Sequence, residues 1–310
     1  MGLFKKKSSV AEPADEDLTF FTASKANEFR ALAREVFAEL GYEVQINPDH
    51  AIDADGRGYG FWNVAANCHA QPEGQWRGII KEHVQKVLAS FEAPDPFEDL
   101  TSADVTGRLY ARLYDEAAIP GLDAYPHSEF VPGVVEMLAL DLPETVAVFT
   151  RENAARFGGW QTLREQGLAN LRALDNEQLE TLEAPGGGVF WALLGNSVYT
   201  ASKALLLPGL AAELTGRQTR DGHGFLMSVP NRHQVVWHVI GNDNLFSVLN
   251  GMVRFTAMGY SDAPGPVSPH VYWWNGSGYE QLTEVKEDGG IAIHVSPAFE
   301  AVLEATLPRD

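Results

Sequence analysis

Several stretches of the chain repeat apolar residues at intervals of three and four, which places these residues on one face of a helix. The first predicted helix begins at Ser24, whose hydroxyl can cap it, and ends at Leu40, before Gly41. Similar patterns predict helices over residues 75–91, 161–174, 199–214 and 244–258. Pro208 falls within residues 199–214 and predicts a kink or a break there.

Other stretches alternate or cluster apolar residues as β-strands do. They predict strands over residues 42–46, 59–68, 105–114, 131–140, 145–150, 189–194, 224–229, 234–240, 271–274 and 279–282. Two of the connections contain typical turn residues, Pro230-Asn231 and Asn275-Gly276. The second half of the chain is therefore expected to contain two β-hairpins.

The order of these predicted elements favours an α+β fold, because helices and strands are interleaved without the strict alternation of a doubly wound sheet. Each half reads as a helix, paired strands and another helix around mixed or antiparallel sheets. We expect a disordered tail over residues 1–18, an N-terminal α/β half over 19–157 and a C-terminal α+β half over 158–310. The boundary is expected at Gly158 and Gly159, and the two halves can also pack as one unit.

The chain is strongly acidic. Its 310 residues include 42 acidic and 23 basic side chains, which give a formal net charge of -19 at pH 7. Such a charge disfavours nucleic acid and anionic membranes as partners, since both attract basic surfaces. It suits solubility alone or, as a sharper hypothesis, binding to a basic protein.

The N-terminal segment does not match the common targeting signals. Residues 1–7 lack the apolar run of a signal peptide, and Lys6 stands where a myristoylation motif requires Ser or Thr. No run in the chain approaches the roughly 18 apolar residues of a membrane span. We therefore expect a cytoplasmic bacterial protein without stable membrane association.

The cysteine and histidine content argues against a metal site. Cys68 is the only cysteine, so an intrachain disulfide and a thiolate cluster are excluded. On a strand, Cys68 and His69 would point to opposite faces and could not share one metal ion. Asp53 and Asp55 hint at a calcium loop, but the later ligands of an EF-hand are missing. We expect a buried, inert thiol, no metal and no cofactor.

Tyr199 and Lys203 have the spacing of the catalytic pair in short-chain dehydrogenases. Those enzymes also need a glycine-rich turn after their first strand to seat a dinucleotide, and a serine roughly a dozen residues before the tyrosine. Here residues 185–188 read Pro-Gly-Gly-Gly, and the glycines near Gly56 belong to a turn. We therefore reject the dehydrogenase interpretation and place Tyr199 at the start of a helix.

A polar group is expected at the open end of the first predicted hairpin. Asp221 and His223 precede its first strand, and His238 lies near the end of its second. The carboxylate could orient a histidine that acts as a general base. No serine in a Gly-x-Ser-x-Gly motif accompanies these residues. They are the candidate catalytic residues of a hydrolase.

Candidate binding residues lie in both hairpins. Arg232 and His233 occupy the polar turn of the first hairpin, where they are free to contact a partner. Tyr272, Trp274 and Tyr279 belong to the second, where alternation turns some aromatic side chains to the core and others outward. An exposed Trp beside Tyr suits a protein interface, and the alternative is a core with an aromatic edge.

A series of short segments resembles one protein family in sequence and order. The segments are Arg108-Leu109-Tyr110-Ala111-Arg112-Leu113, Met137-Leu138-Ala139-Leu140-Asp141-Leu142-Pro143, Leu168-Ala169-Asn170-Leu171-Arg172, Tyr199-Thr200-Ala201-Ser202-Lys203, Val229-Pro230-Asn231-Arg232-His233 and Val271-Tyr272-Trp273-Trp274-Asn275-Gly276. Over roughly residues 25–285, the chain is similar to the uncharacterised YtpQ-like family of bacterial cytoplasmic proteins. The resemblance implies no assigned activity. Family members can carry Arg in place of Lys203, which further weakens the dehydrogenase interpretation.

Because no catalytic motif is complete, we interpret the chain as a non-catalytic cytoplasmic protein-binding protein of adaptor, chaperone-like or immunity type. The alternative is a hydrolase or a small-molecule-binding protein with a site near Asp221, His223 and His238, or in a groove near Tyr199. An enzyme requires these polar residues to meet around a pocket. A binding protein requires an exposed aromatic or acidic face.

Overall fold

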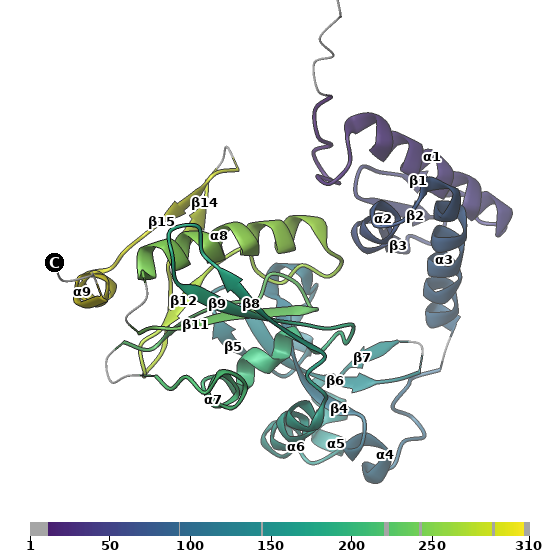
Figure 1. Ribbon diagram of the computed structural model, residues 1–310. Coiled ribbons are helices and arrows are strands. Elements are labelled where there is room, and N and C mark those ends of the chain that lie inside the picture. Colours follow the sequence, from purple (N-terminus) through teal and green to yellow (C-terminus); the bar gives the residue numbers. More distant parts are fainter. Residues whose placement is uncertain are drawn as a thin grey trace, which may run out of the picture. The chain divides into compact units, whose positions relative to one another are not determined.

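The computed structural model describes residues 12–92, 94–143, 145–219, 223–241, 244–286 and 289–306. They form two compact units (Figure 1), one within residues 12–92 with 261–264 and the other within residues 94–260 with 265–306. The boundary expected at Gly158 and Gly159 lies inside the second unit, where Phe157 and Leu163 share one hydrophobic cluster.

Helices and a small sheet make up the first unit. Its elements are α1 (Ala23–Glu39), β1 (Val44–Ile46), β2 (His50–Asp53), β3 (Gly58–Gly60), α2 (Trp62–His69), η1 (Glu73–Gln75) and α3 (Trp76–Glu92). The strands pair antiparallel in the order β1-β2-β3. The hydroxyl of Thr22, rather than that of Ser24, caps α1 by accepting from the N–H of Lys25.

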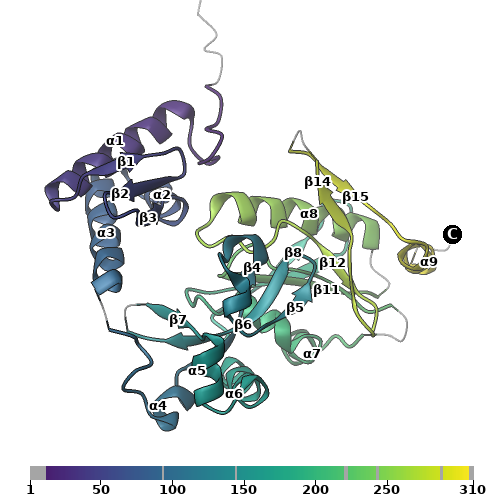
Figure 2. The same cartoon turned by 180° about the vertical axis from the view of Figure 1, so that it is seen from behind.

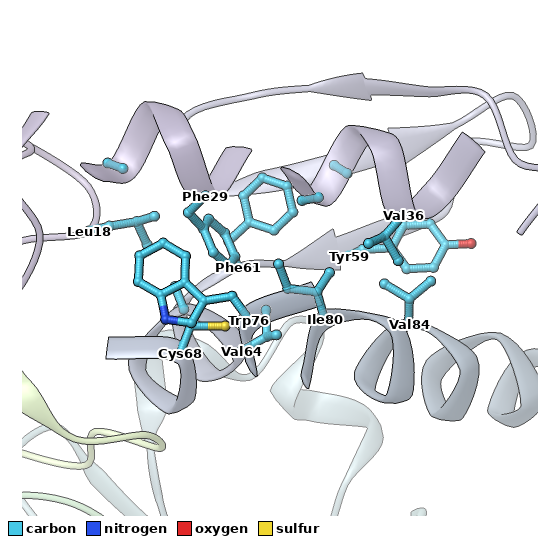
Figure 3. Packing of buried hydrophobic residues seen from close by; sticks show 14 of the residues in the cluster. Leu18, Phe29, Val36, Tyr59, Phe61, Val64, Cys68, Trp76, Ile80 and Val84 are labelled. Carbon is cyan, nitrogen blue, oxygen red and sulfur yellow. The ribbon is translucent and has the colours of Figure 1, made fainter. Parts of the chain in front are cut away.

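Apolar residues of α1 and α3 form much of the core of this unit (Figure 3). Phe29 and Val36 of α1 are buried against Ile80 and Val84 of α3. These are the positions that the helical spacing placed on one face of each predicted helix. Both helices are confirmed as amphipathic elements.

The strand predicted over residues 59–68 is wrong beyond Gly60, because α2 begins at Trp62. Phe61 and, within α2, Val64, Ala65 and Cys68 belong to the hydrophobic core of this unit. Their spacing of three, one and three is helical, not alternating. Cys68 is buried as expected, and burial raises the pKa of its thiol to about 12.

The second unit contains the larger sheets. Its elements are α4 (Ser102–Thr106), β4 (Leu109–Asp115), η2 (Glu116–Ala118), η3 (Leu122–Ala124), β5 (His127–Val131), β6 (Val134–Asp141), β7 (Val146–Val148), α5 (Arg151–Arg156), α6 (Trp160–Ala173), β8 (Gln178–Glu183), β9 (Val189–Leu194), η4 (Ala201–Leu206), α7 (Gly209–Thr215), β10 (Phe225–Ser228), β11 (Gln234–Val239), α8 (Leu245–Asp262), β12 (Tyr272–Trp274), β13 (Tyr279–Gln281), β14 (Thr283–Val285), β15 (Ile291–Ile293) and α9 (Pro297–Thr306).

A six-stranded sheet of order β13-β12-β10-β11-β9-β8 is the centre of the second unit. Strand alternation sends Leu226 and Val236 to one face, where they pack with Val248 of α8. Met227 and Trp237 face the other side, with residues of α7 and of a second sheet of order β4-β6-β5. Figure 2 shows β4, β5 and β6 from behind the view of Figure 1.

Every strand pair between described residues is antiparallel, and helices and strands are interleaved along the chain. The fold is therefore α+β, as the sequence predicted. Within the described parts of the chain, no helix combines the length and apolar character needed to cross a membrane.

Both predicted hairpins are confirmed by their register. Phe225 lies opposite Val239 in the first, and Trp274 lies opposite Tyr279 in the second. The break predicted near Pro208 is also confirmed, since η4 ends at Leu206 and α7 begins at Gly209.

Two predicted strands begin differently in the structure. Residues 102–106 form α4, where Thr101 and Asp104 make a reciprocal capping box, and the strand starts only at Leu109. The strand predicted over residues 131–140 is interrupted after Val131, and β6 begins at Val134. Gly133 supplies the positive φ of 78° that this turn requires.

Candidate functional site

Tyr199 and Lys203 have separate structural roles. The Tyr199 hydroxyl donates to Asp141 Oδ1 at 3.0 Å. Lys203 Nζ donates to the carbonyl of Leu174, the residue directly after α6, and to Asn176 Oδ1. Burial raises the pKa of the Tyr199 phenol, whereas a dehydrogenase needs it lowered. The geometry is consistent with rejection of the dehydrogenase interpretation.

The three candidate catalytic residues occupy different surroundings. Asp221 lies outside the described residues. His238 is fully buried in β11 opposite Leu226, and its Nδ1 hydrogen-bonds the carbonyl of Val189 at 2.7 Å. The backbone carbonyl of His223 accepts from Trp273 Nε1 at 2.8 Å. The strand register does not pair the two histidines, and a catalytic role for this group remains a prediction.

The predicted binding turn is held by its own side chains. Arg232 Nε donates to His233 Nε2 at 2.9 Å, so His233 must carry its proton on Nδ1, which lies 3.1 Å from the carbonyl of Gly195. Burial and the charge of Arg232 hold the pKa of His233 below its ordinary value. The imidazole is therefore neutral and fixed in one tautomer.

The aromatic residues of the second hairpin pack mainly against the unit itself. Tyr272 is fully buried, and its hydroxyl donates to the carbonyl of Pro132 at 3.0 Å. Trp274 stacks on Phe225 at a centroid distance of 5.1 Å, and Tyr279 contacts Phe225 edge-on. This arrangement is the core with an aromatic edge, which leaves Trp274 and Tyr279 only partly exposed.

A polar pocket of about 400 Å³ lies at one end of the six-stranded sheet. Gln178 of β8, Leu194 of β9 and Gln234 of β11 are register partners, so they face the same side of the sheet. Glu177 and His233 complete the wall beside them. The pocket therefore spans the ends of three neighbouring strands.

The pocket offers hydrogen-bond acceptors and negative charge. Hydrogen bonds from the backbone N–H groups of Asn196 and Ser197 keep the pKa of Glu177 below its ordinary value, so its carboxylate is ionised near neutral pH. Gln234 Oε1 is buried without a hydrogen-bond partner in the described chain. Since His233 is neutral, the pocket suits a cationic group that carries several N–H donors.

An acidic strand edge begins at this pocket. β8 is the last strand of the six-stranded sheet, and no other described strand pairs with its outer side (Figure 1). Residues 175–195 contain four carboxylates, at Asp175, Glu177, Glu180 and Glu183, and no lysine or arginine. Thr181 and Glu183 are exposed along the strand. The edge presents backbone hydrogen-bonding groups in a negative field.

The sequence pattern did not reveal β8. Its apolar residues, Leu179 and Leu182, are three apart, which is not the alternation of a half-buried strand. A usable signal was the glycine-rich turn before β9, where Gly187 and Gly188 have φ values of 93° and 88°. A strand that follows such a turn pairs with a strand that precedes the turn, so the turn indicates a strand before Gly187.

Comparison with known protein families, curated proteins and solved structures finds no match to this chain. The resemblance to the YtpQ-like family therefore stays a prediction.

Proposed function

We propose that this protein is a non-catalytic binding protein that holds a basic, extended segment of another protein along the edge of β8. The observation that carries the proposal is an open, acidic strand edge that begins at an acceptor-lined pocket. A bound segment would add a further strand to the sheet, with main-chain hydrogen bonds giving affinity. A lysine or arginine of the segment would enter the pocket beside Glu177.

The charges of the edge favour a different protein over a second copy of this chain. Two β8 edges brought together would place Glu180 and Glu183 against like charges, which disfavours pairing. A basic strand meets opposite charges at the same positions. The charges of the edge therefore select a basic partner. Its backbone N–H and C=O groups hydrogen-bond the backbone of that partner.

The surroundings of the candidate catalytic His238, of the rejected pair Tyr199 and Lys203, and of the binding candidate His233 support a non-catalytic role. Tyr199, Lys203 and His238 each make a hydrogen bond that holds neighbouring backbone or side chains in place. His233 is neutral, and both of its ring nitrogens have hydrogen-bond partners. A general base needs a nitrogen or oxygen that can reach a substrate.

The test is binding of a labelled peptide of alternating lysine and valine, as long as β8, measured by fluorescence anisotropy with the full chain. The double substitution of Glu180→Lys and Glu183→Lys should weaken binding by about tenfold or more, because it replaces attraction with repulsion. Added salt should weaken wild-type binding as well.

The matched control carries Glu165→Lys and Glu304→Lys, which change the net charge equally at exposed positions on α6 and α9. This variant should bind the peptide nearly as tightly as the wild-type protein. Equal weakening in both double variants would mean that the peptide senses only net charge, and the proposal would fail.

A further inference from the structure

Arg112 of β4 and Arg232 of the turn after β10 lie in one region of the second unit, where hydrogen bonds connect their segments. Tyr110, Arg112 and Tyr114 share one face of β4, because strand alternation separates them from the buried Leu109, Ala111 and Leu113. The Arg112 guanidinium lies 4.6 Å from the ring centroid of Tyr114 and 5.7 Å from that of Tyr199.

A short segment connects the two arginines. Leu113 N–H donates to Ser202 Oγ at 3.0 Å, which ties β4 to the start of η4. One residue earlier, Ala201 N–H donates to the carbonyl of Arg232 at 3.1 Å. Gly265 leaves room for the Arg232 side chain, since a Cβ there would lie 2.6 Å from Arg232 Cδ. These two hydrogen bonds and the space beside Gly265 hold Arg232 next to residues 201–202, which contact β4.

The charge of Arg112 acts on Arg232 and on the neighbouring His233. Burial and the nearby charge of Arg112 hold the pKa of Arg232 below its ordinary value, and Arg112 also lowers the pKa of His233. Nearby Asp141 accepts from Tyr199. The positive charges therefore repel each other at this place.

Several other arginines of this chain pair with a carboxylate. Arg30 pairs with Asp15, Arg164 with Glu136 and Arg172 with Glu213. In the described parts of the molecule, neither Arg112 nor Arg232 has a carboxylate within ion-pair distance. An acidic chain that leaves two half-buried guanidiniums unneutralised departs from the usual pairing of buried charges.

Two further polar atoms lack partners at the same place. Arg112 Nε and the Tyr114 hydroxyl are buried and have no hydrogen-bond partner among the described residues. Among the described residues, the Arg232 guanidinium makes one hydrogen bond, from its Nε to His233. The terminal nitrogens of both guanidiniums thus remain as donors, in the planar geometry that binds oxyanions.

We propose that Arg112 and Arg232 form a binding site for the oxyanion of a small molecule, either a carboxylate or a phosphate, with the Tyr114 hydroxyl as a third donor. The anion would bridge the two guanidiniums and remove their repulsion. The site adjoins the pocket at the β8 edge, because Arg232 donates to His233 in the wall of that pocket. It adds a ligand to the proposed binding function.

Calorimetric titration of the full chain tests this site with inorganic phosphate and, separately, with acetate, each against sodium chloride of equal ionic strength. Arg112→Gln and Arg232→Gln should each weaken binding by about tenfold or more. Arg172→Gln is the matched control, because it removes an arginine whose partner is Glu213. Tighter binding of phosphate or of acetate identifies which oxyanion the site prefers.

Melting temperatures separate an anion site from a packing role. In chloride buffer, Arg112→Gln should melt no lower than the wild-type protein, since it relieves repulsion, whereas Arg232→Gln also loses the hydrogen bond to His233. The bound anion should raise the wild-type melting temperature but not that of either variant. The proposal is overturned if neither anion binds, if both variants bind it like the wild-type protein, or if Arg112→Gln loses stability in chloride. If a glutamine variant fails to fold, Arg112→Lys takes its place. Lysine keeps the charge but lacks the planar guanidinium, so this variant should also bind the anion more weakly.

Discussion

Individual side chains in this protein are fixed by partners that the sequence pattern does not reveal. The spacing of Tyr199 and Lys203 suggests one catalytic pair, yet their polar atoms bind Asp141 and the end of α6. Arg232 and His233 were correctly predicted in a turn, but their contact with each other depends on the turn's geometry. The local sequence shows that such residues are polar, but the tertiary structure determines which groups they contact.

One residue-scale prediction concerns Asp15 in the first unit. Its carboxylate accepts from both terminal nitrogens of Arg30, at 2.9 and 2.7 Å, and this contact lowers its pKa to about 2. Because the folded pKa lies below the unfolded value, the stabilisation is complete above about pH 4 and is lost as pH falls toward 2. Asp15→Asn should therefore cost about 2 kcal/mol at pH 7 and progressively less below pH 4.

Urea unfolding at several pH values measures this difference. Asp55→Asn is the control, because Asp55 forms only an exposed pair with Arg57, with 70% of its side-chain surface accessible. Such pairs contribute little to stability. A penalty for Asp15→Asn that stays constant down to pH 2 would contradict the assigned ion pair.

At the scale of elements, the sequence predicted the helices and strands whose apolar residues repeat regularly. It missed the elements whose apolar residues show no regular repeat. The stripes of α1, α3, α6 and α8 are regular over many residues, so their helices were expected within a few positions. Residues 61–68 contain both apolar runs and helical spacing, and tertiary packing selects the helix α2. β8 has too few buried residues to show a period at all.

A pair of glycines tests packing at this scale. Gly167 lies in α6 where an added Cβ would be 2.6 Å from the backbone nitrogen of Ala111 in β4. Gly78 lies in α3, and an added Cβ there meets nothing within 4 Å. Gly167→Ala should destabilise the protein by about 1–3 kcal/mol, because the obstructing atoms belong to backbone. Gly78→Ala should stabilise it by about 0.5–1 kcal/mol through helix propensity.

Thermal and urea unfolding of the two glycine variants give the signs directly. Both carry the same chemical change within a helix, so propensity alone predicts the same direction for each. If Gly167→Ala were as stabilising as Gly78→Ala, the close approach of α6 to β4 would be wrong.

At the scale of the whole molecule, the α+β class followed from the order of elements, but the division into units did not. Gly158 and Gly159 resemble a linker in sequence, yet their φ values of 113° and 85° form a turn between α5 and α6. The prolines at Pro94 and Pro96, directly after α3, are the better boundary signal. The acidic edge emerges only when β8, β9 and β11 align, since its pocket joins residues distant in sequence.

The central claim is that a basic segment adds a strand to β8, and hydrogen–deuterium exchange of the full chain with the lysine–valine peptide tests it most directly. The account predicts that the peptide slows exchange of the backbone amides within Gln178–Glu183, because outward N–H groups gain acceptors. The opposite edge, Tyr279–Gln281, should exchange as it does without peptide. Bound peptide with no protection of β8, or with equal protection of both edges, would contradict the account.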